Sequence, residues 1–306
     1  MAAPEKINFE DIKPEEIKSI PTFRAAYSDR TALLMAKLAL RAYQAFDKDE
    51  KLLAEFIKGF EALGLRDVAK LICPDTGTAG YVVSNDDLVA VAFRGSEDKL
   101  DWQTNFRFQF VVLQGGVQVH RGFFRAYRGI REDLFKTLAA LMAKPRPIYL
   151  TGHSLGGAVA MMATAELSNH EDAKLRDSIA ACYTFGSPKV GNRSFDQFVK
   201  VPLYRVTNGI DIVPAVPPWF GYRQVGDTRY FGRLGVAPLR RSPRLVRQAV
   251  RGFRALPGLL WSGELRSISD HRMRMYIDKL TGWVQANNDE ADARRKATAD
   301  PKLKSH

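Results

Sequence analysis

The sequence has 306 residues, 45% of them hydrophobic, so the chain is long enough to bury a substantial core. It contains no run of about 18 apolar residues, so we expect no membrane-spanning helix. The net charge of +12 favours anionic partners, but nucleic acid is not expected, because helix-turn-helix, zinc-finger and RNA-binding signatures are absent.

The N-terminal stretch and the cysteines bear on the cellular compartment. Residues 1–18 are charged throughout and lack the basic region and apolar run of a secretory signal peptide. Cys73 and Cys182 are too few for a disulfide framework or a cysteine zinc site. We therefore expect a cytoplasmic protein, with export without a cleavable signal as the open alternative.

Helical and strand-like patterns alternate along the chain. Helical apolar spacing covers residues 31–46, 50–63 and 123–143, and a hairpin with its turn at 85–87 is predicted over 80–94. Short strand-like runs occupy 118–120, 147–151, 178–185 and 202–207. This alternation predicts an α/β fold with a mostly parallel sheet, which binds ligands at the carboxyl ends of its strands.

The pattern also suggests how the chain is divided. We expect one domain over residues 1–284, beginning with a helical part at about 30–63. Residues 285–306 are polar and have no apolar face, so a disordered tail is expected there.

A serine between two glycines follows the strand at 147–151. Residues 152–156 read Gly-His-Ser-Leu-Gly, the G-x-S-x-G pattern, and a small-residue segment, GGAVAMMATAEL, continues from it. A strand, a sharp turn and a helix form the context of a nucleophile elbow, in which larger side chains at Gly152 and Gly156 would collide with neighbouring elements. The pattern predicts that Ser154 is a nucleophile, and the alternative is a chance glycine-rich turn.

A serine nucleophile needs a base, and the sequence offers five histidines. Because the chain order in such sites is serine, acid, histidine, His120 and His153 come too early. His306 is the last residue of the polar tail, and few acids separate the serine from His170. His271 is therefore the predicted base, with a surface histidine capping a helix as the alternative.

The acid is expected between the serine and the base. Asp211 follows the strand-like run at 202–207, at the end where a loop can direct a carboxylate at an imidazole. Asp227 is the second candidate, and Asp270 is disfavoured because it adjoins His271 in sequence. The alternative role for Asp211 is to cap a turn.

An oxyanion hole is predicted from two backbone N–H groups. One belongs to Leu155, the residue after the nucleophile, and the other comes from the loop after an earlier strand. The strand ending at residue 93 runs into Arg94-Gly95-Ser96, so Ser96 is the second predicted donor, with an ordinary strand-end turn as the alternative.

Six sequence blocks together resemble the class 3, fungal-type lipase family of the α/β-hydrolase fold. In chain order they are VAFRGSEDKLDWQTN (91–105), VHRGFFRAY (119–127), LTGHSLGGAVA (150–160), YTFGSPKVGN (183–192), YRVTNGIDIVPAVPP (204–218) and SDHRMRMYI (269–277). The resemblance implies hydrolysis of glycerolipid esters without metal or cofactor. By position it implies Ser154 as nucleophile, Asp211 as acid, His271 as base, and Ser96 and Leu155 at the oxyanion hole.

A basic segment lies between the predicted acid and base. Residues 238–262 contain no acid, and a helix at about 242–256 places four arginines on one face: Arg244, Arg247, Arg251 and Arg254. This pattern fits a helix that docks on an anionic membrane surface, and it equally fits a helix packed on the body with a solvated basic face.

The predicted function is that of a triacylglycerol lipase or a phospholipase A1-type enzyme, with a lipid ester as its partner. A lipid-binding protein on an inactive hydrolase scaffold is an alternative, which the presence of all three triad residues disfavours. An acyltransferase is a further alternative, because it would share the acyl-enzyme intermediate.

Overall fold

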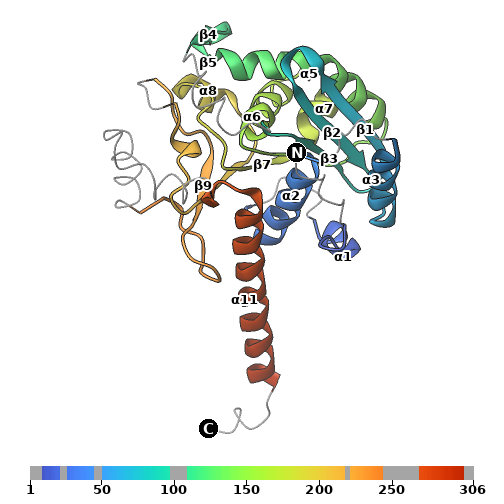
Figure 1. Ribbon diagram of the computed structural model, residues 1–306, viewed down its shortest axis with the longest axis vertical. Helices are drawn as coiled ribbons and strands as arrows, with labels where there is room; N and C mark the ends of the chain where they lie inside the picture. Colours follow the sequence, from blue (N-terminus) through green and yellow to red (C-terminus); the bar gives the residue numbers. More distant parts are fainter. Residues whose placement is uncertain are drawn as a thin grey trace.

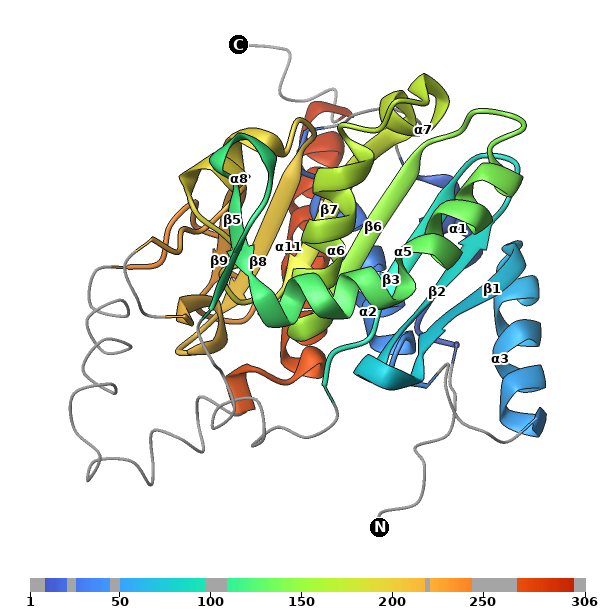
Figure 2. The same cartoon turned by 90° about the horizontal axis from the view of Figure 1, so that it is seen from above.

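The computed structural model describes residues 9–20, 26–44, 50–96, 109–217, 221–243 and 269–299. Within them, seven strands form one sheet in the order β1-β2-β3-β6-β7-β8-β9 (Figure 2). Their bounds are Arg66–Cys73 (β1), Thr78–Ser84 (β2), Val89–Phe93 (β3), Ile148–His153 (β6), Ile179–Phe185 (β7), Leu203–Asn208 (β8) and Asp227–Phe231 (β9). The pairs β1–β2 and β2–β3 are antiparallel, and β3, β6, β7, β8 and β9 are mutually parallel.

Helices cover both faces of this sheet (Figure 2). Helices α5 and α6 lie on one face, and α2 and α11 lie on the other. The bounds of the helices are Pro14–Lys18 (α1), Asp29–Arg41 (α2), Glu50–Ala62 (α3), Arg121–Leu141 (α5), Leu155–Leu167 (α6), Ala173–Ser178 (α7), Arg193–Phe198 (α8) and Met273–Ala299 (α11). A small hairpin of β4 (Phe110–Val112) and β5 (Gln118–His120) precedes α5, and short 3-10 turns occupy Pro74–Thr76 (η1), Gln114–Gly116 (η2) and Val213–Ala215 (η3).

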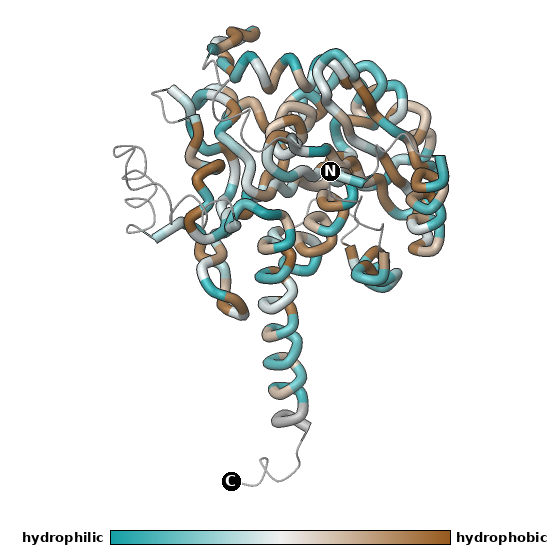
Figure 3. The backbone as a smooth tube through the Cα atoms, in the orientation of Figure 1, coloured by the Kyte–Doolittle hydropathy of each residue, from teal (hydrophilic) through white to brown (hydrophobic). Residues whose placement is uncertain are grey.

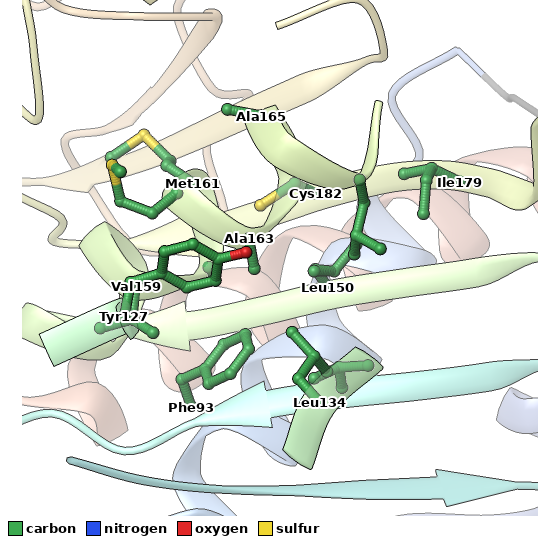
Figure 4. Packing of buried hydrophobic residues seen from close by; sticks show 14 of the residues in the cluster. Phe93, Tyr127, Leu134, Leu150, Val159, Met161, Ala163, Ala165, Ile179 and Cys182 are labelled. Carbon is green, nitrogen blue, oxygen red and sulfur yellow. The ribbon is translucent and has the colours of Figure 1, made fainter. Parts of the chain in front are cut away.

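The sheet is buried on both faces, which explains its apolar strands. Along β3, Val91 and Phe93 pack toward α5 and α6, while Ala90 and Ala92 pack toward α2. Figure 4 shows Phe93 and Leu150 of the sheet packed with Tyr127 of α5 and Val159 of α6. Because alternate side chains of a strand face opposite ways, a doubly covered strand reads as a continuous hydrophobic run.

Helix α6 is the most deeply covered of the described helices. Eleven of its 13 residues are buried, and most of them are small, so the helix axis approaches the sheet closely. The helix begins where β6 ends, at the carboxyl edge of the parallel strands. Its N-terminus therefore lies at the edge where α/β sheets bind ligands.

Most of the predicted elements are confirmed. The hairpin appears as β2 and β3, and the Asn85 side chain closes its turn by accepting hydrogen bonds from the backbone N–H groups of Asp87 and Leu88. The edge strands β1 and β9 escaped prediction because charged residues interrupt their sequences. Among the described helices, none combines the length and the hydropathy needed to traverse a bilayer.

The expectation of a disordered tail from residue 285 is wrong as far as Ala299, because α11 continues to that residue and projects from the body (Figures 1 and 3). The exposed turns carry pairs of side chains one helical turn apart: Gln285 donates to Asp289, and Arg294 donates to Glu290. Such pairs stabilise a helix without an apolar face. Residues 300–306, and residues 244–268 with most of the predicted basic helix, lie outside the described residues.

Candidate active site

Ser154 occupies a sharp turn between β6 and α6. Its backbone has φ 56° and ψ −126°, a conformation that costs a residue with a side chain on the order of 1–3 kcal/mol. A Cβ atom at Gly152 would overlap the backbone of Gly156, and one at Gly156 would overlap the carbonyl of Phe93. The two glycines therefore let β6, α6 and the end of β3 meet around the serine.

The structure brings the three predicted triad residues together from distant parts of the chain. His271 Nε2 lies 2.9 Å from Ser154 Oγ, and His271 Nδ1 lies 2.9 Å from Asp211 Oδ2. Because a carboxylate only accepts hydrogen bonds, Nδ1 carries the ring proton of the neutral histidine and Nε2 accepts the serine hydroxyl. The Asp211 side chain is fully buried, and that of His271 is 12% exposed.

Two further groups hold the Asp211 carboxylate. Its Oδ1 accepts a hydrogen bond of 2.8 Å from the backbone N–H of Val213, and its Oδ2 accepts one of 2.6 Å from the Tyr276 hydroxyl. Burial and the adjacent carboxylate raise the pKa of Tyr276 well above its ordinary value, so the phenol stays a neutral donor. Tyr276 belongs to α11, and nothing in its sequence position singles it out.

His153, which the chain order removed as a base, supports the backbone of His271. Its Nε2 lies 2.7 Å from the His271 carbonyl oxygen, and its Nδ1 lies 2.7 Å from the Tyr43 hydroxyl. Because a carbonyl only accepts, Nε2 donates to it and Nδ1 accepts from Tyr43. The two imidazole rings lie 4.6 Å apart, so a residue just past the end of α2 is connected to the segment that carries the base.

Ser96 and Leu155, the predicted oxyanion donors, line the same cavity as Ser154. The loop that carries Ser96 lies against the serine turn, since a Cβ atom at Gly95 would come within 2.8 Å of the His153 carbonyl oxygen. Leu155 is the first residue of α6, where backbone N–H groups have no acceptor within the helix and attract negative charge.

The other acids considered between Ser154 and His271 have different partners. Asp227 forms an ion pair of 2.7 Å with Arg229 on β9, and its side chain is 45% exposed. Asp270 Oδ2 accepts the backbone N–H of Ile210 at 2.8 Å and so holds the loop that carries Asp211. The four arginines of the predicted basic helix lie outside the described residues.

The cavity over Ser154 has a volume of about 620 Å³. Leu155, Phe123 and Val213 contribute apolar surface, while Arg121 and Arg125 of α5 and Asp75 of η1 contribute charge. A serine that lines such a cavity and is hydrogen-bonded to a histidine can attack a carbonyl carbon that reaches it.

His120 also lines the cavity, and its titration makes the fold sensitive to acid. Its Nδ1 caps α5 by accepting backbone hydrogen bonds from Gly122 and Phe123, and burial lowers the pKa of this histidine to about 4. The unfolded chain, with an ordinary histidine pKa of about 6.5, therefore binds more protons as the pH falls below that value. The linked loss in the free energy of unfolding is about 2 kcal/mol at pH 5.

We expect His120→Asn to keep the helix cap and to lose this acid sensitivity. Urea unfolding at pH 7 and pH 5 measures it: the stability of wild type should fall by about 2 kcal/mol more than that of the variant over this interval. Equal losses in the two proteins would contradict the assignment.

The fold and the serine site define an α/β-hydrolase. The family model for lipase (class 3) matches residues 90–221. The chain is 39% identical to the secreted mono- and diacylglycerol lipase 1 of Fusarium solani over 166 residues, covering 51% of this chain and 48% of that protein. It is 34% identical to a lipase of Rhizomucor miehei over 152 residues, covering 47% of this chain and 41% of that protein.

A solved lipase structure is also similar to this chain. The structure described as a serine protease triad forming the catalytic centre of a triacylglycerol lipase superposes with a TM-score of 0.61 and 26% identity, covering 70% of this chain and 85% of that one. Residues 90–221 of this chain are therefore similar to class 3 lipases. The chain spans about half, or less, of the length of the curated relatives described above.

The comparisons overturn one expectation from the sequence. A cytoplasmic protein was predicted from the N-terminal stretch and the two cysteines, but the similar lipase of Fusarium solani is a secreted protein. The physical reason for the error is that composition near one end of a chain is a weak indicator of compartment.

Proposed function

We propose that this chain is a serine ester hydrolase that cleaves the carboxylic esters of glycerolipids through an acyl-enzyme. The hydrogen-bonded series from Asp211 through His271 to Ser154 Oγ is the observation that carries the proposal. The match of residues 90–221 to the class 3 lipase family model and the names of the relatives, which are lipases, support the lipid ester as substrate.

Acylation follows from these contacts. His271 Nε2 takes the hydroxyl proton as Ser154 Oγ bonds to the ester carbonyl carbon, and the carbonyl oxygen becomes an oxyanion near the N–H groups of Ser96 and Leu155. Asp211 holds the ring and stabilises the imidazolium. Collapse of the intermediate breaks the ester bond, and the imidazolium returns its proton to the leaving alcohol.

Deacylation repeats the same steps with water. His271 takes a proton from water as the water oxygen attacks the acyl-enzyme carbonyl, and Ser154 leaves with the proton that the imidazolium gives back. The products are a fatty acid and the free serine, so no metal or cofactor is required by the balance of the reaction.

The setting of the reaction is part of the proposal. We infer an extracellular site of action, in line with the secreted relative. Attraction to an anionic membrane through Arg244, Arg247, Arg251 and Arg254 stays a prediction, and the oligomeric state is open.

A phosphonate ester that releases p-nitrophenol tests the nucleophile directly. We expect one equivalent of p-nitrophenolate per chain, a phosphonyl adduct on the peptide that contains Ser154, and loss of fatty acid release from a diacylglycerol in parallel. Fatty acid release before labelling separates hydrolysis from acyl transfer. An adduct elsewhere, or full activity with Ser154 modified, would overturn the proposal.

A further inference from the structure

The first two turns of α5 form one wall of the cavity that holds Ser154. Arg121, Gly122, Arg125 and Ala126 all line it. Residues four apart on a helix lie on the same side, so Arg121 and Arg125 are neighbours on one face of α5. Both side chains belong to exposed residues and reach solvent at the cavity rim.

These two guanidinium groups are not neutralised within the described part of the chain. Arg121 Nη1 donates to the neutral Gln109 Oε1 at 3.0 Å, and neither arginine forms an ion pair with a described carboxylate. Asp75 is the one acid among the described lining residues, and it is exposed on η1. Among the described lining residues, the charged side chains are therefore two arginines and one aspartate.

The backbone adds to this positive potential. Helix α5 begins at Arg121 and has no acid in its first turn, and α6 begins at Leu155, which lines the same cavity. The N-termini of both helices thus face one space, and each favours a negative charge there. Among the described lining residues, those at the two helix starts are suited to an anionic group.

We propose that Arg121 and Arg125 bind the phosphate of a glycerophospholipid whose acyl ester lies at Ser154. The inference rests on the proposed esterase function and names its substrate class. A guanidinium matches phosphate oxygens with two parallel hydrogen bonds. The anion and the ester have to share one cavity, and among glycerolipids a phospholipid carries both within a few bonds of each other. A fatty acid product brings an anion but no ester.

Short-chain substrates below their critical micelle concentration test the subsite without a membrane surface. The substrates are dihexanoylglycerol, dihexanoylphosphatidylcholine and dihexanoylphosphatidylglycerol, and the proteins are wild type, the double variant Arg121→Gln with Arg125→Gln, and Arg128→Gln. Arg128 is exposed on the same helix but does not line the cavity, so it is the matched control.

We expect the double variant to lose about 10-fold or more in kcat/KM on both phospholipids and less than about 2-fold on dihexanoylglycerol. Arg128→Gln should match wild type on all three esters. Inorganic phosphate should inhibit dihexanoylglycerol hydrolysis by wild type more strongly than by the double variant.

Equal losses of kcat/KM by the double variant on all three esters would overturn the phosphate assignment. It would also be overturned if inorganic phosphate inhibited wild type but wild type hydrolysed neither phospholipid. Either result leaves the esterase in place. A wild type that hydrolyses none of the three esters, including the neutral one, would instead reject the proposed function and this inference with it.

Discussion

Ser154→Ala should abolish fatty acid release, lowering kcat by about 10⁶-fold, the loss measured when the serine of a comparable triad is removed. The hydroxyl is the group that bonds to the acyl carbon, and its oxygen lies 2.9 Å from His271 Nε2. Alanine keeps a Cβ atom at the strained turn, so the backbone at φ 56° is neither relieved nor further crowded. The variant should therefore fold with a Tm close to that of wild type.

Release of oleate from dioleoylglycerol is the measurement, with Ser168→Ala as the control. Ser168 lies at the other end of α6, where its hydroxyl donates to the carbonyl of Ala165, so its loss should cost some stability and leave kcat unchanged. A Ser154→Ala protein that releases oleate at the wild-type rate would show that another group is the nucleophile. Inactivity of wild type would favour the non-enzymatic lipid-binding alternative.

The triad could be proposed from sequence because its members obey a fixed chain order and follow strand ends. Ser154 and His271 are 117 residues apart in sequence, and Asp211 and His271 are 60 apart. Ser154 and Asp211 nevertheless follow the carboxyl ends of parallel strands, and His271 contacts both of them at this edge of the sheet. That edge is determined by topology, and topology was readable from the alternation of strands and helices.

The groups that support the triad could not be predicted in the same way. Tyr43 and Tyr276 are unremarkable tyrosines at the end of one helix and within another, and only the packing of α2 and α11 on one sheet face brings them to His153 and Asp211. His153 carried a signal, since it adjoins the nucleophile. Chain order alone excluded His153 as the base, and nothing in the sequence indicated its hydrogen bond to the His271 carbonyl oxygen.

Helix α11 illustrates a different limit. Its exposed part has no apolar periodicity, which is the pattern that predicts a packed helix. Its first turns pack Met273, Tyr276 and Leu280 into the core. Polar contacts with α2 follow, where the Trp283 indole donates to Asp29 at 2.8 Å and Arg30 donates to Asn288 at 2.6 Å. Contacts between residues more than 250 positions apart leave no trace in local hydropathy.

Asp211→Asn should lower kcat by about 10⁴-fold, as the same change does in a comparable triad. The two carboxylate oxygens accept from His271 Nδ1, Tyr276 and Val213. An amide has one acceptor and one NH₂ group, so either orientation sets a donor against a donor in a fully buried position. If the NH₂ faces His271, Nδ1 becomes an acceptor, and the ring proton moves to Nε2, where it blocks the transfer from Ser154.

Steady-state hydrolysis of dihexanoylglycerol checks this expectation, and Asp227→Asn is its matched control. Asp227 is the second candidate acid from sequence, and its side chain, which is 45% exposed, pairs with Arg229 at 2.7 Å. That change should alter kcat by less than about 2-fold, because Asp227 is paired with Arg229 rather than with His271. A large loss with Asp227→Asn and a small one with Asp211→Asn would transfer the role of the acid to Asp227. Comparable small losses in both would mean that the His271 tautomer does not depend on a carboxylate at all.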